Sequence, residues 1–221
     1  LLMVAGRPEE ALETFESYLE RYGELKGPAE SGRKLDVLMR RGTLEKEAGR
    51  ELLAASSWQQ LVEEAAGWDR PEDREVLAQA WLARAGIHME GEQYGEVTGS
   101  LSRMIGFFGD RLEPGWIPLN QARLERGRAY ALTGNREMAL EDFSAIRQLP
   151  DGGGTGILEI RAAALHQECS LLLQMEQYDR LREITSEIPA DLTGHAGREV
   201  RSHLMAVLRS RQQALEKLDL P

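Results

Sequence analysis

Apolar residues recur along most of the chain at intervals of three and four, which is the period of one face of an α-helix, and no segment alternates as a strand does. Stretches rich in glycine and proline interrupt this pattern at residues 23–32, 67–73, 109–118, 150–156 and 188–197. Each long segment between them has a weaker interruption near its middle. This layout predicts pairs of helices joined by turns, and therefore an all-α protein.

One helical segment also alternates very small and very large residues, which a lone amphipathic helix does not need. Its residues follow the repeat pattern W-x2-L-G-x2-Y…A-x3-F…P at Gly127, Tyr130, Ala139, Phe143 and Pro150. Arginine replaces the Trp and Leu of the pattern, at Arg123 and Arg126. The second half of the pattern occurs again near the N-terminus, at Gly6, Ala11 and Phe15. On these residues the sequence resembles the tetratricopeptide repeat (TPR) family.

Three weaker copies share an aromatic residue three positions before the residue that takes the place of Ala139. These pairs are Trp58 and Leu61, Tyr94 and Val97, and Tyr178 and Leu181. The anchors Ala11, Leu61, Val97, Ala139 and Leu181 are then 50, 36, 42 and 42 residues apart. The family standard is about 34 residues, so we expect extended helices or loops.

The resemblance implies an all-α, right-handed superhelical solenoid of about five antiparallel helix pairs, with Gly127 and Ala139 where the two helices of one pair cross closely. We expect a single repeat domain over residues 1–221, with units near 1–22 (partial), 34–66, 73–108, 118–149 and 158–190. Residues 198–218 are expected to form a C-terminal capping helix. Because the chain starts at Leu1, inside a repeat, we expect a fragment of a longer protein. An ordinary helical bundle is the alternative.

Charge and composition narrow the classes of partner. The formal net charge is −10, from 37 acidic and 27 basic residues, which disfavours binding to nucleic acid. No apolar run is long enough to cross a bilayer. A single cysteine rules out an intramolecular disulfide and fits a reducing compartment without excluding an oxidising one. The preference for arginine over lysine indicates a bacterial source.

Candidate catalytic chemistry is sparse. His166 and Cys169 are three residues apart on an expected helix and could share a metal with a third ligand, but Cys169 also falls where the repeat wants a small apolar side chain. Residues 150–156, PDGGGTG, lack the Lys-Ser/Thr of a P-loop and follow a helix, so we interpret them as a linker. We therefore expect no enzyme activity, no cofactor and no metal.

The resemblance also implies a binding surface, because the first helices of TPR pairs line a concave groove. Carrying the family's groove positions across gives Lys46, Arg50, Gln79, Leu82, Met89, Gln121, Leu124, Arg128, His166 and Ser170. These side chains suit an extended or helical peptide. The family's chaperone-tail clamp is matched only at Lys46, since Arg50, Ala83, Gln121 and Glu125 replace its other residues.

The loop at residues 106–119 concentrates Phe107, Phe108, Trp116 and Ile117, which form a docking patch if exposed and fill a gap between repeats if buried. We favour burial.

The sequence as a whole predicts a non-catalytic scaffold that binds another protein or a peptide in its groove. The alternatives are an oligomerisation module, a regulatory arm of a larger multidomain protein, and an envelope-assembly protein. The sequence does not decide the compartment, which is either the bacterial cytoplasm, slightly favoured, or the periplasm.

Overall fold

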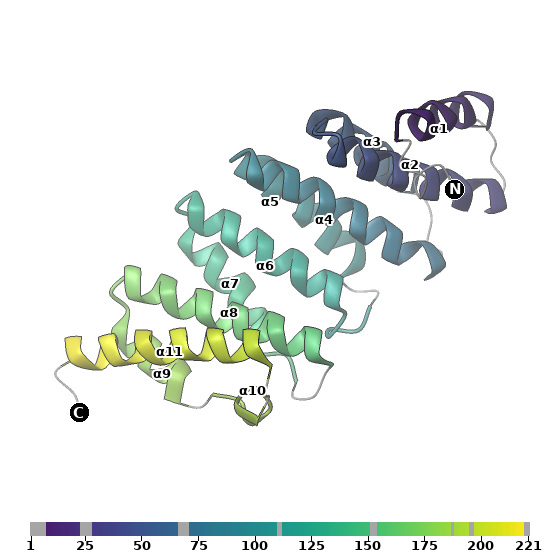
Figure 1. Ribbon diagram of the computed structural model, residues 1–221. Coiled ribbons are helices and arrows are strands. Elements are labelled where there is room, and N and C mark those ends of the chain that lie inside the picture. Colours follow the sequence, from purple (N-terminus) through teal and green to yellow (C-terminus); the bar gives the residue numbers. More distant parts are fainter. Residues whose placement is uncertain are drawn as a thin grey trace. The chain divides into compact units, whose positions relative to one another are not determined.

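The computed structural model describes residues 8–22, 28–65, 71–109, 112–150, 154–186, 188–194 and 197–218. Over these residues the chain is helical throughout, without a strand (Figure 1). The helices are α1 (Pro8–Tyr22), α2 (Pro28–Glu47), α3 (Glu51–Ala65), α4 (Arg74–Glu90), α5 (Tyr94–Phe108), α6 (Ile117–Leu132), α7 (Arg136–Arg147), α8 (Thr155–Gln174), α9 (Tyr178–Ser186), α10 (Ala190–Gly194) and α11 (Arg198–Lys217), and a 3-10 turn, η1 (Pro71–Asp73), precedes α4. The predicted all-α class is confirmed.

The helices group into two compact units, Leu1–Glu92 and Gln93–Pro221, with the boundary in the turn between α4 and α5. In unit 1, α2 and α3 pack as a pair, α1 packs on α2, and α4 packs on both α3 and α2. In unit 2, α6 pairs with α7 and α8 with α9, while α5 packs on α6 and α7 on α8. The predicted succession of packed helix pairs is confirmed. The single domain over residues 1–221 stays a prediction.

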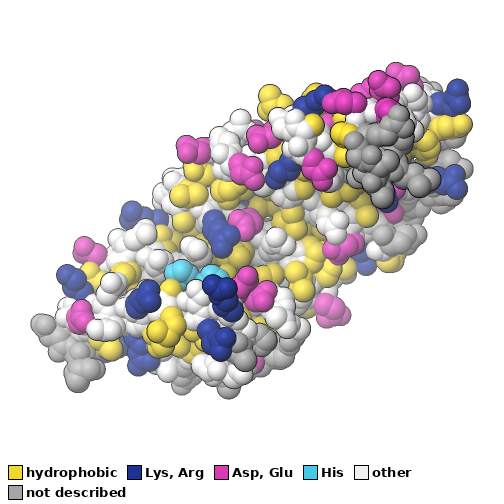
Figure 2. Space-filling model, viewed as in Figure 1, with side chains coloured by type: hydrophobic (Ala, Val, Ile, Leu, Met, Phe, Trp, Pro, Cys, Tyr) yellow, Lys and Arg dark blue, Asp and Glu magenta, His cyan; other side chains and the backbone are white. Residues whose placement is uncertain are grey.

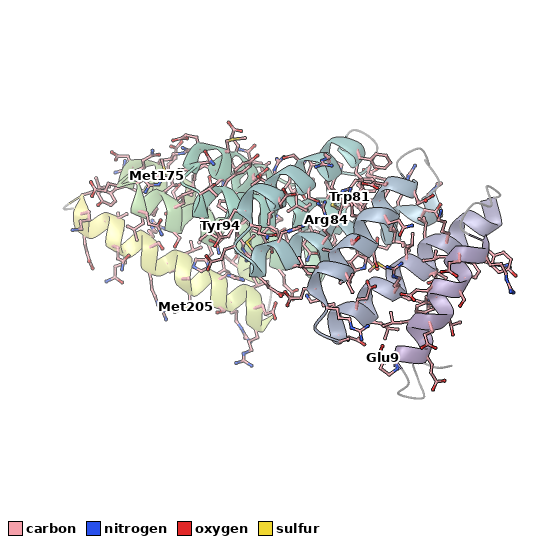
Figure 3. All side chains as sticks on the ribbon, turned by 90° about the horizontal axis from the view of Figure 1, so that it is seen from above. Glu9, Trp81, Arg84, Tyr94, Met175 and Met205 are labelled. Atoms are coloured by element: carbon pink, nitrogen blue, oxygen red, sulfur yellow. The ribbon has the colours of Figure 1, made fainter. Side chains whose placement is uncertain are left out.

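The last helix, α11, closes unit 2. It packs along α8 and α9 through buried residues that include Val200, Val207 and Ala214. Its opposite side carries exposed side chains, among them Met205, which points away from the other helices of this unit (Figure 3). A helix with one buried and one polar side suits the end of a repeat array.

The close crossing inside the α6–α7 pair is a contact between a glycine and a ring. Gly127 on α6 faces Phe143 on α7 so closely that a Cβ at Gly127 would lie 2.6 Å from Cε1 of the ring. The α2–α3 pair repeats this contact, since a Cβ at Gly42 would lie 2.5 Å from Nε1 of Trp58. In both pairs the glycine precedes the ring by 16 residues.

A second repeated feature is a left-handed residue two positions after the end of each first helix, α2, α4, α6 and α8. Four such residues have positive φ: Gly49 at 71°, Glu92 at 56°, Gly134 at 80° and Glu176 at 59°. The left-handed conformation lets the chain reverse after the first helix and start the second one. These residues are 43, 42 and 42 positions apart, so they fix the register of four successive repeats without reference to side-chain similarity. Gly6, the matching glycine of the N-terminal copy, lies outside the described residues.

This register corrects the anchor that the sequence pattern predicts in the second repeat, α2 with α3. Trp58 occupies the place of Phe143, and Ala54, which is fully buried, occupies the place of Ala139. Leu61 is therefore seven residues, or two helical turns, beyond the true anchor. With Ala54 the anchors Ala11, Ala54, Val97, Ala139 and Leu181 are 43, 43, 42 and 42 residues apart, and all are buried. The irregular spacing of 50 and 36 was an error of alignment, and the repeat is regular.

The arginine that replaces the Leu of the pattern has its own partner. Arg126 on α6 donates two hydrogen bonds to the Asp142 carboxylate on α7, at 2.8 and 2.7 Å, and a third to Ser102 on α5 at 3.0 Å. Its guanidinium also lies 5.8 Å from the ring centre of Tyr130. Asp142 is 5% exposed, so an ion pair substitutes here for an apolar contact and ties α5, α6 and α7 together.

Candidate functional site

Nine of the ten residues predicted for a groove lie on the first helices of the pairs, Arg50 lies in a turn, and the ten are divided between the two compact units. Unit 1 carries Lys46 on α2, Arg50 in the turn after α2, and Gln79, Leu82 and Met89 on α4. Unit 2 carries Gln121, Leu124 and Arg128 on α6, and His166 and Ser170 on α8. Each unit therefore has its own candidate surface, and each is described by itself.

In unit 1 polar side chains link the helices beside the candidate surface. The Lys46 ammonium lies 3.4 Å from the Glu90 carboxylate and so connects α2 with α4. Arg50 lies in the turn before α3 and donates to Glu9 on α1 at 2.7 Å. Both pairs are exposed, so each contributes little to stability. Arg50 is thus engaged with α1 and not aligned with the first-helix positions.

Apolar side chains lie among these charges. Leu82 and Met89 on α4 are half-buried, as is Met39 on α2, which the corrected register places at the position equivalent to Leu82. Thr43 is the other first-helix residue that the register predicted from the sequence missed. The 16-residue spacing from Gly42 to Trp58, the same as from Gly127 to Phe143, is the signal that could have found them. Flexible thioether and leucyl side chains at a surface adapt to varied apolar partners.

In unit 2 the surface centres on three nitrogen-bearing side chains from three helices. Arg128 on α6 is half-buried and pairs with Glu125 at 2.7 Å. Nδ1 of His166 on α8 lies 3.1 Å from Nδ1 of His203 on α11. The groove expected from the sequence does not include His203, because the sequence predicts only a capping role for residues 198–218. Figure 2 shows this pair of histidines at the surface of unit 2, among cationic and acidic side chains.

Burial and neighbouring charge both act on these two imidazoles. Burial, then the proximity of His203 and of Arg128, lowers the pKa of His166. Burial and Arg128 also lower the pKa of His203, while Glu199 acts in the opposite direction. Both rings are therefore neutral at pH 7, and Arg128 is the positive charge of this surface.

The other predicted residues of unit 2 differ in what they offer. Gln121 is exposed and Ser170 is half-buried, so both are accessible. Leu124 is 5% exposed and belongs to the hydrophobic core, so it presents little surface.

The aromatic loop forms a packed cluster where α5 ends and α6 begins. The Phe107 and Phe108 ring centres are 4.9 Å apart and perpendicular, and Phe108 and Trp116 are 5.0 Å apart at 63°. Phe108 is 1% exposed, Phe107 and Trp116 are half-buried, and Ile117 is 43% exposed. The cluster mainly fills space, with Ile117 at its exposed edge. Residues 110 and 111 lie outside the described residues.

Reactive groups do not converge in the described parts of the chain. No group of three or more His, Cys, Asp or Glu side chains there could hold a metal ion. Cys169 is fully buried, and burial raises its pKa to about 12, so its thiol is protonated and inert. The centre of the glycine-rich linker, residues 151–153, lies outside the described residues, as does His195. None of the described helices combines the length and the apolar content needed to cross a bilayer.

The second helices form a different surface in unit 2. A cavity of about 310 Å³ between α7 and α9 is lined by Glu137, Leu140, Glu141, Ser144, Ala145, Gln148 and Arg180. Its mixed charges carry no indication of a ligand.

Packed helix pairs in steps of 42 to 43 residues, two of them with a glycine against a ring at the crossing, give the chain a TPR-like helical repeat fold. No protein-family model and no curated protein matches its sequence. Solved structures share the fold. BtubC (BKLC) from P. vanneervenii has a TM-score of 0.58 at 11% identity, over 95% of this chain and 89% of that one.

A Podosopora anserina putative kinesin light chain with nearly identical TPR-like repeats has a TM-score of 0.57 at 16% identity, over 88% of this chain and 94% of that one. A variant of that protein with one substitution has a TM-score of 0.58 at 17% identity, over 89% and 94% of the two chains. These similarities establish the fold.

Proposed function

We propose that the chain is a non-catalytic scaffold that binds a segment of another protein on the surfaces of its first helices. The observation that carries this proposal is the surface of α2 and α4 in unit 1. There Met39, Leu82 and Met89 leave apolar area accessible beside the Lys46–Glu90 ion pair. Apolar anchors next to charged side chains are what a peptide needs for affinity and orientation.

The equivalent surface of unit 2 would supply a different kind of contact. Arg128 offers a charged donor, and Gln121 and Ser170 offer neutral hydrogen-bonding groups. A segment that spans polar and apolar stretches would use both kinds of surface, and no cofactor or metal would take part.

A random peptide library displayed on phage, selected on the immobilised chain, tests the proposal. Selected peptides are then titrated by calorimetry against Leu82→Ser, Met89→Ser and Arg128→Ala. Truncating a binding anchor costs more than about 1 kcal/mol, so we expect affinity to fall about tenfold for at least one variant. Met138→Ser is the matched control, because Met138 is 46% exposed on α7, a second helix.

The outcomes separate the surfaces. Loss of affinity only in Met138→Ser would place binding on the second helices and overturn the proposal. A library that yields no binder would do the same for peptide recognition as such.

Self-association is a second candidate function. Met205 and Leu208 on α11 are 53% and 46% exposed and leave an apolar stripe among the arginines of that helix. Light scattering on the chain at increasing concentration tests it, since a monomer at all concentrations would exclude α11 as a homotypic interface.

A further inference from the structure

Two imidazoles meet where the last helix of unit 2 packs on α8. The Nδ1 atoms of His166 and His203 are 3.1 Å apart, the ring centres are 5.4 Å apart, and the rings are inclined by 46°. At this distance one Nδ1 carries a hydrogen and donates it to the lone pair of the other. The contact therefore needs at least one neutral imidazole, because two protonated rings would bring two N–H groups face to face.

The surrounding helices add positive charge to this place. Arg128 on α6 acts on both rings and is itself paired with Glu125, whereas Glu199 on α11 acts on His203 alone. Four further arginines, on α7, α8, α9 and α11, have partners of their own. These pairs are Arg147 with Glu168, Arg161 with Asp191, and Arg182 with Asp179, and Arg211 donates to the Thr185 carbonyl. The carboxylates of Glu168, Asp191 and Asp179 are therefore already engaged with arginine and not with the imidazoles.

We propose that the His166–His203 contact is a pH-sensitive latch, which holds α11 on α8 at neutral pH and weakens that packing when the solution is acidified. The latch is the two imidazoles alone, and the apolar contacts of Val200, Val207 and Ala214 are unaffected by pH. Acidification therefore favours the opening of α11 first, while the α6–α7 pair stays closed.

The direction follows from linkage. The folded chain holds both imidazoles at lowered pKa values, so folding favours their neutral forms. Their contribution to stability is complete above the unfolded value of about 6.5 and is lost as the pH falls through the lowered values. An opening that takes up one proton becomes about tenfold more favourable for each pH unit in that interval.

The latch also bears on binding, and this part rests on the proposed function. His166 lies on the candidate surface of unit 2, so protonation adds positive charge beside Arg128 and loosens one border of that surface. Binding at unit 2 would then depend on pH while binding at unit 1 would not.

Amide hydrogen exchange on the whole chain tests the latch. Protection is compared at about pH 7.5 and about pH 5.5, after correction for the intrinsic exchange rate, for amides of α11 and of α6. We expect α11 to lose protection relative to α6 at the lower pH, by up to about tenfold for each proton that opening takes up. His203→Asn should reduce this difference, because it removes one of the two titrating imidazoles and because an amide can donate to or accept from Nδ1 of His166 in either protonation state.

His88→Asn is the matched control, since it removes a half-buried imidazole from unit 1 and should leave the pH response of α11 intact. Equal loss of protection in the unmodified chain and in His203→Asn would overturn the latch, as would unchanged protection of α11. No peptide takes part in this measurement, so failure of the proposed function leaves its outcome unaffected.

Discussion

Gly127 lies against the ring of Phe143, and the closeness of this contact sets the distance between α6 and α7. A Cβ at Gly127 would lie 2.6 Å from one ring atom and 3.1 Å from two others. Phe143 is 1% exposed, so the ring is enclosed by its neighbours.

Gly127→Ala should therefore destabilise the chain. Alanine gains about 1 kcal/mol of helix propensity over glycine, but overpacking a buried contact costs about 1 to 3 kcal/mol, and we expect the cost to dominate. Gly99→Ala is the control, because Gly99 is a helical glycine of α5 with nothing within 4 Å of the added Cβ. Urea unfolding should show a lower midpoint for the first variant and a higher one for the second. A stabilised Gly127→Ala would mean that the helices can separate freely.

Glu176 adopts a left-handed conformation that favours glycine. At φ 59° its side chain costs about 1 kcal/mol, and the residue is exposed, so Glu176→Gly should raise stability by up to that amount. Gly134→Ala, at φ 80° and with nothing near the added Cβ, should have the opposite effect through strain alone. Chemical unfolding of both variants measures this. Equal signs for the two substitutions would contradict the shared role of these positions.

The Arg126–Asp142 ion pair should also contribute to the stability of the chain. Breaking a largely buried ion pair strands one charge, so Arg126→Ala should cost about 3 kcal/mol, and Asp142→Leu in the same chain should recover part of the loss. The comparison is Arg40→Ala, whose partner Asp36 and own side chain are both more than half exposed. That variant should change stability by less than about 1 kcal/mol. Similar losses at the two sites would show that the burial of Asp142 has no energetic weight.

Cys169 should react with a thiol reagent only when unit 2 opens. Burial raises its pKa to about 12, so at pH 8 neither the thiolate nor an access path is present in the folded chain. The rate of reaction with a disulfide reagent should follow the unfolding equilibrium as urea is added. Rapid reaction of the folded chain would show that α8 is accessible without unfolding.

The fold was largely predictable because helix pairs leave strong local signals. The 3.6-residue period, the glycine and proline breaks, and Gly127 with Ala139 and Phe143 correctly indicated the order of the helices. The register predicted for the second repeat was wrong for a physical reason. A shift of seven residues is two helical turns and returns the same face to the core, so Leu61 and Ala54 are both fully buried and the apolar pattern cannot separate them. The backbone conformation of Gly49 resolves the ambiguity.

The candidate surfaces were less predictable than the fold. Arg50 followed from the shifted register and lies in a turn beside Glu9, and the partner of His166 comes from α11, 37 residues away. A contact between distant helices leaves no local trace in one sequence. The groove roles of all ten residues remain predictions for the binding experiment.

The even interval between the left-handed turns has a consequence for how such a chain can change in length. Deleting the stretch from Arg136 to Gln177 would join the turn at Gly134 directly to the start of α9, with every remaining helix still in phase. A gene that encodes this array can therefore gain or lose one whole hairpin at a time, whereas a deletion that is neither a whole repeat nor a whole number of helical turns would turn a buried face toward solvent.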